Sequence, residues 1–246
     1  MRLAFAPAAL LFFALNAPAN SLAEFKAALQ RLDGDTPIRG QVSVKSENRS
    51  TEGKDEMETR AGIAQIGFDD GPQGLRLHYP QPLLNKAAQE DLARRANSKA
   101  ATPTSTGLGE LGFREVRGMT RAAESLQRLT ANAQLKGERM DNWQGQPAKV
   151  LSFELPQTET NKYVKEFSWK LDVFLAPDGT PLGARSTQKS SGRAYVVVSF
   201  EFSSEEELHY AVSGERLVTT RRISRGGGSG AGEKGSTAKT LSLQLG

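Results

Sequence analysis

The chain has 246 residues, with 32 Lys and Arg against 28 Asp and Glu, which gives a formal net charge of +4 at neutral pH. This mild balance argues against nucleic-acid binding, which requires a concentrated basic surface. The chain holds no Cys, which excludes disulfide bonds, thiolate metal sites and cysteine nucleophiles. At this length a sizeable apolar core can form without disulfides.

The N-terminal residues are typical of an export signal. A short basic start, Met1-Arg2, precedes an apolar run over residues 3–15, and Ala17-Pro18-Ala19 matches the small-x-small pattern read by signal peptidase. The run is shorter than the roughly 20 apolar residues that a transmembrane helix needs. We therefore expect residues 1–19 to be a signal peptide cut after Ala19, a periplasmic location, and no transmembrane segment in the mature chain.

A helix is predicted at the start of the mature chain. Ser21 and Glu24 have the spacing of a capping box, in which each side chain accepts a hydrogen bond from a free backbone N–H group of the first turn. The apolar residues that follow recur at helical spacing on one face. They are Leu22, Phe25, Leu29 and Leu32.

Most of the remaining chain alternates apolar and polar residues, which predicts strands with one buried face. The clearest example covers residues 167–175, where Phe, Trp, Leu, Val and Leu occupy every second position. Turn residues such as Asp178-Gly179 separate these stretches, and a polar, charged stretch over residues 46–58 resembles a hairpin. We expect eight to ten antiparallel strands arranged as a meander.

A helical insertion is predicted at about residues 81–133, between two groups of strands. Residues 83–99 are rich in Ala, Leu, Glu and Arg, which favour helices. Residues 102–107 are interpreted as a linker, and apolar residues from Leu108 to Leu129 then return to helical spacing. The predicted fold class is therefore α+β: residues 20–246 form a single domain with a large curved, mostly antiparallel meandering sheet (a half-barrel). The N-terminal helix and the helical insertion pack on that sheet.

A Gly-rich segment near the C-terminus contains the pattern G-x-G-x-x-G at residues 230–235. That pattern binds a pyrophosphate only where it follows a strand and opens a helix, whose N-terminus supplies N–H groups and a dipole. Residues 240–245 instead alternate like a strand. We therefore interpret residues 226–236 as a flexible hairpin loop and expect no nucleotide and no other cofactor.

The residues that could carry catalysis do not form a recognised set. His78 and His209 are the only histidines, and their spacing matches no zinc-binding motif. Ser186 and Lys189 spell S-x-x-K, but in a strand these positions face opposite sides of the sheet. The sequence therefore predicts a non-enzymatic protein without a metal site. A hydrolase that uses one of the histidines is the less favoured alternative.

Large apolar residues lie in or beside the predicted strands and insertion, and a curved sheet that wraps helices often holds an apolar ligand. Seven residues are candidates for lining such a ligand site: Met119, Leu126, Trp143, Phe153, Trp169, Leu171 and Phe200.

The order of these elements resembles the periplasmic lipoprotein-carrier superfamily, which includes the outer-membrane lipoprotein carriers and the N-terminal domain of anti-sigma-factor regulators. The similar features are the export signal, the helix at residues 22–32, a first strand at 40–44, and the strand-turn-strand segments at 142–153 and 175–182. The resemblance covers most of the mature chain as architecture, without a diagnostic motif, and it assigns no functional residue.

In that superfamily an unclosed sheet curls around helices, and its apolar hollow holds acyl chains. The resemblance thus implies a soluble periplasmic protein that binds a lipid, another apolar ligand or a lipidated partner. An uncharacterised exported family on a similar fold remains equally open. The alternative function is a protein-interaction or sensor module of the cell envelope, which would dock an envelope protein through its two polar hairpins, residues 46–58 and 226–236.

Overall fold

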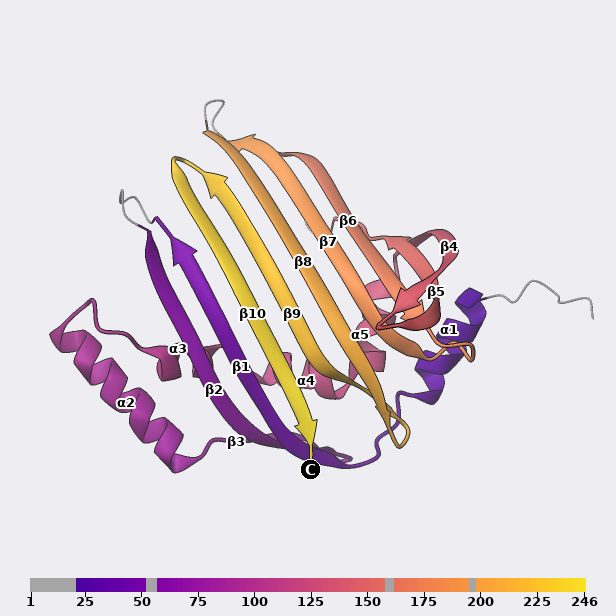
Figure 1. Cartoon of the computed structure of the whole chain (residues 1–246), viewed down its shortest axis with the longest axis horizontal. Helices are drawn as coiled ribbons and strands as arrows, with labels where there is room; N and C mark the ends of the chain where they lie inside the picture. The colour runs from indigo at the N-terminus through magenta and orange to yellow at the C-terminus, as the bar shows by residue number, and fades with distance from the viewer. Residues whose placement is uncertain (1–20, 52–56, 158–161, 195–197) are drawn as a thin grey trace, which may run out of the picture.

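The computed structural model describes residues 21–51, 57–157, 162–194 and 198–246, so the predicted signal peptide lies outside the described residues. The described strands are β1 (Ile38–Ser50), β2 (Glu58–Gly71), β3 (Gly74–His78), β4 (Gln134–Trp143), β5 (Gln146–Glu154), β6 (Val164–Leu175), β7 (Pro181–Ala194), β8 (Val198–Ser213), β9 (Arg216–Gly230) and β10 (Glu233–Leu245). They form one open sheet in the order β3-β2-β1-β10-β9-β8-β7-β6-β5-β4, and every pairing is antiparallel. The predicted fold class is confirmed (Figure 1).

Pairing of the first strand with the last joins the two groups of strands into one sheet. β1 lies beside β10, with Val42 opposite Leu243 and Val44 opposite Leu241. All four side chains are buried, because the period-two alternation places them on the same face of the sheet. The chain therefore meanders from β1 to β3, leaves the sheet, and returns as the meander β4 to β10.

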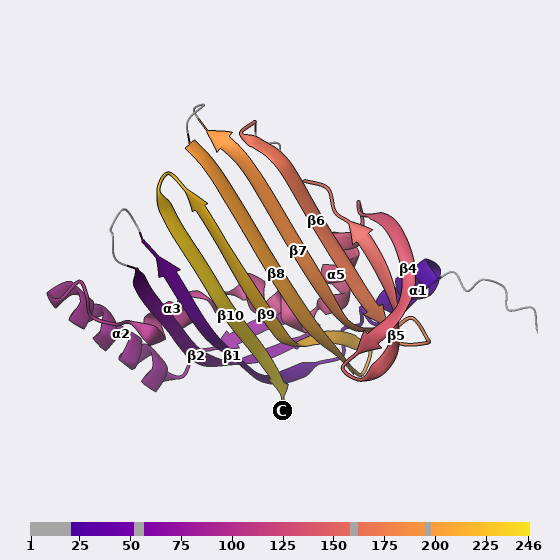
Figure 2. The same ribbon diagram turned by 45° about the horizontal axis from the view of Figure 1, so that its top comes forward.

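The five described helices lie on one side of this sheet, and we call the face on that side the helix-side face. They are α1 (Ser21–Arg31), α2 (Gln81–Ala96), α3 (Pro103–Gly109), α4 (Phe113–Thr120) and α5 (Ala122–Thr130). Helices α4 and α5 contact β9, and α3 contacts β2 and β1. Helix α2 packs on α3 and lies beyond β2, the strand next to the short edge strand β3 (Figures 1 and 2).

The core lies between the helices and the sheet in two apolar clusters. One joins α1 and α5 to β5, β6 and β7, where Phe25 and Leu126 meet Leu151 and Leu171. The other joins α4 to β1, β2 and β10. One row of paired residues crosses the sheet beneath both clusters and is apolar except at β9: Leu151, Val173, Ala184, Leu208, Arg222, Leu241, Val44 and Ala64.

Residues 103–107, interpreted from the sequence as part of a linker, begin α3 instead. The carboxylate of Glu90 in α2 accepts hydrogen bonds from the backbone N–H groups of Thr104 (2.7 Å) and Ser105 (3.1 Å). These N–H groups have no partner within their own helix, so a side chain from a different helix caps α3. Such a distant cap leaves no signal in the local sequence.

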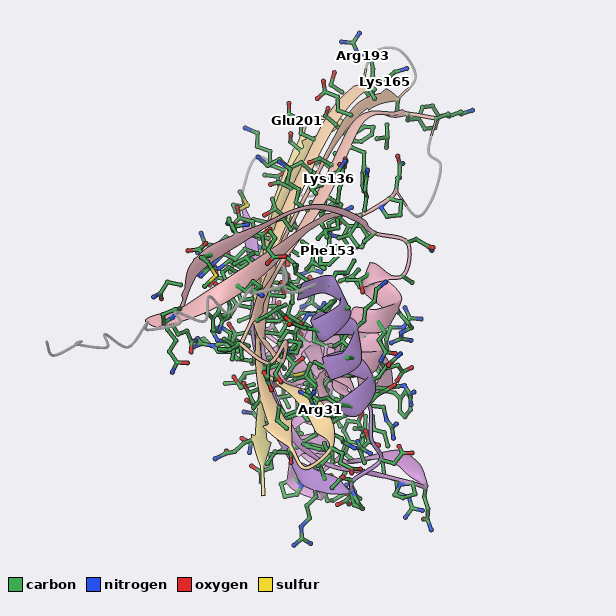
Figure 3. All side chains as sticks on the ribbon, turned by 90° about the vertical axis from the view of Figure 1, so that its right-hand side faces the viewer. Arg31, Lys136, Phe153, Lys165, Arg193 and Glu201 are labelled. Carbon is green, nitrogen blue, oxygen red and sulfur yellow. The ribbon has the colours of Figure 1, made fainter. Side chains whose placement is uncertain are left out.

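The strands are longer than the helix layer, so the far part of the sheet carries no helix (Figures 1 and 3). We call this region the distal part of the sheet, and its helix-side surface the open face. The distal part comprises residues 48–50 of β1, 58–60 of β2, 164–169 of β6, 188–194 of β7, 198–204 of β8, 226–230 of β9 and 233–237 of β10.

The Gly-rich segment belongs to this distal part, so the prediction of a loop over residues 226–236 is wrong for all but two residues. Residues 226–230 pair with β8 on one side and with β10 on the other. The connection is only Ala231 and Gly232, whose φ angles of 54° and 83° fit a tight two-residue hairpin turn. Two neighbouring strands supply backbone partners to every residue, which outweighs the low strand propensity of Gly.

The other predicted hairpin also shortens. Residues 46–50 are the end of β1 and pair with both β2 and β10, although the sequence there is polar. Residues 52–56 of that hairpin lie outside the described residues.

Candidate apolar-ligand site

Four aromatic side chains lie on the open face because of strand register. Phe167 and Trp169 of β6 follow Leu171 at every second position, so they share its helix-side orientation. Across β7, Phe167 is aligned through Ser190 with Phe202 of β8. Phe200 lies one step further along β8. Phe202 is 43% exposed and the other three are half-buried.

Glycines form the floor beside these aromatic residues. Gly228 and Gly230 of β9 lie directly opposite Phe202 and Phe200, and Gly226 lies opposite Ser204. Because these glycines carry no side chain, the backbone of β9 is bare on this face. The open face is thus a flat strip of sheet with an aromatic ridge on one side.

A small, partly open cavity adjoins the open face where α4 and α5 begin to cover the sheet. Its volume is about 140 Å³. Its apolar lining comes from both layers and includes Met119, Leu126 and Leu129 from the helices and Leu171 and Leu208 from the strands. Pockets for drug-sized ligands have roughly 300–1,000 Å³, so this cavity can hold only part of such a ligand.

Polar groups also line this cavity. The Arg222 guanidinium contacts the carboxylate of Glu206, and its Nη1 donates to Glu115 of α4 at 2.9 Å. Burial alone would lower the pKa of Arg222, but the two carboxylates outweigh it and raise that pKa, so the guanidinium stays charged. Burial raises the pKa of the neighbouring Tyr210, which keeps its hydroxyl neutral. The cavity is therefore amphiphilic, with an ion-paired side and an apolar side.

Trp169 connects the cavity to the open face. Its indole Nε1 donates to Ser186 Oγ at 2.9 Å, and Ser186 lines the cavity. Trp169 itself is one step further along the sheet, where the open face begins. Strand register therefore places Leu171, Trp169 and Phe167 in one row along β6, and Phe167 is aligned across Ser190 with Phe202.

The seven predicted lining residues fall in four places. Met119, Leu126 and Leu171 line the cavity, and Trp169 and Phe200 lie on the open face. Phe153 is buried against Phe25 of α1, with ring centroids 6.2 Å apart. Trp143 is on the opposite face of the sheet, where it packs on Phe174.

The sequence prediction missed the polar lining and two of the four aromatic residues on the open face. Phe167 and Phe202 stand two positions from Trp169 and Phe200, so the same alternation already places them on one face. Glu206 and Arg222 gave no such signal, because their meeting depends on the register between β8 and β9.

A second cluster lies on the opposite face, at the end of the sheet near β4. The Arg185 guanidinium is 5.1 Å from the ring centre of Trp143, and its Nε donates to Glu207 at 2.9 Å. His209 lies between Glu207 (2.8 Å) and Gln144 (2.6 Å). Burial by itself raises the pKa of Glu207. Hydrogen bonds from Arg185 and His209 lower that pKa by more, so it lies below its ordinary value.

The two histidines are far apart in the sheet. His78 is on β3, beside Asp69 at 2.5 Å, and His209 is on β8. Four strands, β2, β1, β10 and β9, lie between β3 and β8. Ser186 and Lys189 face opposite sides of β7, as the alternation predicts. Neither pair forms a catalytic arrangement in the described part of the chain.

Within the described residues, no group of three or more His, Asp or Glu side chains could hold a metal ion. No helix in that part of the chain is long and apolar enough to cross a membrane. Comparisons with protein-family models, curated proteins and solved structures found no match.

Proposed function

We propose that this protein is a non-enzymatic binding protein that holds an elongated apolar or amphiphilic ligand, such as a lipid or the acyl chain of a lipidated partner, along the open face. The observation that carries the proposal is the alignment, on one face of the sheet, of the cavity-lining Leu171 with the aromatic residues Trp169, Phe167, Phe202 and Phe200. Exposed aromatic residues in a row are otherwise unfavourable for a soluble sheet.

The size of the cavity constrains how such a ligand lies. At about 140 Å³ it holds only one end of the ligand, and the remainder extends over the glycine floor beside Phe202. Burial of apolar ligand surface against these rings supplies the affinity, at roughly 25 cal/mol per Å². The paired charges of Arg222 and Glu206 at the cavity would orient a polar group of the ligand.

The same proposal includes export to the periplasm through residues 1–19 and membership of the lipoprotein-carrier-like architecture. Its support is the sequence pattern of the N-terminus and the open curved sheet with helices on one face. The alternative, docking of an envelope protein through two flexible hairpins, has less support because residues 46–50 and 226–230 are paired strands.

Displacement of a fluorescent fatty acid tests this proposal. The chain has two Trp residues, so Trp143→Phe leaves Trp169 as the only indole and makes its emission a reporter of the open face. We expect the probe to bind and to shift that emission. Phe200→Ser with Phe202→Ser should weaken binding at least about tenfold, because each ring contributes on the order of 1 kcal/mol or more.

Met140→Ser is the matched control, since Met140 is 69% exposed on the edge strand β4, away from the open face. Its affinity for the probe should be unchanged. Absence of probe binding, or equal affinity in the Phe200→Ser/Phe202→Ser variant, would contradict the proposal.

A further inference from the structure

A long stretch of β2 has no neighbouring strand on its outer side within the described residues, although α3 contacts this stretch at Ile63. β2 has 14 residues, but β3 pairs only with residues 67–71. No described strand pairs with the outer side of residues 58–66. An edge of this length is a template for another strand unless something blocks it.

The backbone groups on this edge are arranged for pairing. Gly71 and Gly74 close the two-residue hairpin between β2 and β3, so they form a hydrogen-bonded pair. Every second residue of β2 then directs its N–H and C=O groups outward, away from β1. Along the uncovered stretch these residues are Thr59, Ala61, Ile63 and Gln65. Among them Ile63 is 56% exposed, and its side chain lies on the face opposite the helices.

Helix α2 has an apolar stripe that covers nothing in its own chain. Of its 16 residues only Ala87 is buried. Leu84, Ala88 and Leu92 recur every four residues and therefore share one face, yet Leu84 is 39% and Leu92 is 61% exposed. A helix usually turns its apolar stripe toward a core.

The position of α2 relates these two features. It lies beyond the edge of β2, within the layer of the helices (Figures 1 and 2). A strand added to β2 would extend the sheet across α2, so that α2 would lie on the helix-side face of the added sheet. A second copy of this chain fits this arrangement, because one chain supplies the unpaired edge of β2, the exposed stripe of α2 and the sheet face without helices.

We propose that two copies of this chain pair through β2 in an antiparallel, twofold-symmetric dimer centred near Gly62. In this register Ala61 lies opposite the partner's Ile63, so two apolar side chains meet on one face. The α2 helix of each copy lies over the distal parts of β2, β1 and β10 of the other. The Leu84–Ala88–Leu92 stripe then packs on a surface that includes Gly235, Thr237 and Asn48.

The expected contact area is sufficient for a stable dimer. A 16-residue helix is about 24 Å long and about 10 Å wide, so each α2 covers roughly 240 Å² of sheet. The helix and the sheet beneath it each bury this area, and the twofold axis creates two such contacts. The two helix contacts together therefore bury on the order of 1,000 Å² of accessible surface, before the paired strands are added. Specific interfaces begin near 1,200 Å² in total.

The dimer goes beyond the proposed ligand binding and does not depend on it. The partner helix would cover β2, β1 and β10, whereas the aromatic residues are on β6 and β8. The ligand surface would stay accessible, with a wall along one side. Failure of ligand binding and failure of dimerisation are therefore separate results.

Light scattering coupled to size exclusion measures the mass of the purified chain. We expect twice the mass of one chain across the micromolar range, and a monomer throughout that range would overturn the proposal. Ala61→Pro removes an N–H that faces outward and leaves the pairing with β1 intact, because Pro is tolerated where its nitrogen faces solvent. This variant should raise the dissociation constant of the dimer at least tenfold.

Met140→Pro is the matched control on the other edge of the sheet, where its N–H also faces outward from the hairpin of β4 and β5. It should remain a dimer, and equal weakening in both variants would contradict an interface at β2. Leu84→Gln with Leu92→Gln tests the helix independently of strand stability, since both side chains are exposed within one chain. These substitutions should dissociate the dimer without lowering the melting temperature of the monomer, and a dimer of unchanged affinity would overturn the role of α2.

Discussion

Asp70 and Arg216 form an ion pair in which both side chains are almost completely buried, with 3.1 Å between Oδ2 and Nη1 and exposed fractions of 0% and 2%. Asp70 ends β2 and Arg216 begins β9, so the pair joins the two groups of strands beneath the helices. Thr120, the last residue of α4, and Arg121, which follows it, donate to the same carboxylate at 2.7 and 2.9 Å. No nitrogen of Arg216 makes a well-directed hydrogen bond within the described residues, so its interaction with Asp70 is mainly Coulombic.

Substitution Asp70→Asn should therefore destabilise the fold strongly. It removes the nearer and fully buried of the two carboxylates beside Arg216, the other being Asp35 at 3.8 Å. Loss of one member of a buried pair costs about 3–5 kcal/mol. Urea unfolding followed by circular dichroism measures this change. Asp69→Asn is the control, because Asp69 pairs with His78 at a site where both side chains are 56% exposed. That change should cost less than about 1 kcal/mol. A loss in the free energy of unfolding that is equally small in Asp70→Asn would contradict a stabilising role of the buried pair.

The same pair predicts loss of stability in acid. Burial by itself raises the pKa of Asp70. The hydrogen bonds from Arg121 and Thr120 and the charge of Arg216 lower that pKa by more, so it lies below its usual range. A group with a lowered folded-state pKa stabilises fully above its unfolded pKa, about 3.9 for Asp, and this contribution is lost as pH falls through the folded-state value. At pH values below about 4, the melting temperature should therefore decrease. The fall should be shallower in Asp70→Asn, and identical acid profiles would exclude Asp70 as a cause.

Gly107 should tolerate no side chain, because α3 approaches β2 closely at this residue. A Cβ atom there would lie 2.5 Å from the backbone carbon of Ile63 and 2.8 Å from the nitrogen of Ala64. Gly107→Ala should therefore push α3 off the sheet and cost about 1–3 kcal/mol. Gly109→Ala, two residues on, has no atom within 4 Å of the added carbon and is the control. It should be neutral or stabilise slightly, and a neutral Gly107→Ala would contradict this packing.

The alternation of apolar residues in the sequence predicted the strands because it reports directly which face is buried. Residues 167–173 follow it and belong to β6, whereas Phe174 breaks it because this residue is buried on the opposite face. The same reasoning failed at residues 226–230, where glycines have no apolar side chain to alternate. Their pairing comes from β8 and β10. Long-range partners, which a local pattern cannot report, therefore decide the structure there.

The candidate site was predictable only in part for a related reason. Leu171 and Trp169 were identifiable as members of one strand face, and the structure places them in and beside the cavity. Phe153 has the same apolar character, but α1 covers it with Phe25. Trp143 precedes the turn into β5 and lies on the other face. Which apolar residues remain accessible depends on where the helices end over the sheet, and that depends on packing between distant segments.

Amide hydrogen exchange should distinguish a paired strand from a loop at residues 226–230. Because β9 lies between β8 and β10, the amides of these residues all have backbone acceptors. We expect them to exchange slowly relative to free peptide, while the amides of the turn residues Ala231 and Gly232 exchange fast. Protection should be lower than at Leu217 and Val218, which are buried in the core, because the distal strands are covered by no helix and open locally at lower cost. Exchange at the free-peptide rate across residues 226–236 would contradict the paired hairpin, and with it the glycine floor of the open face.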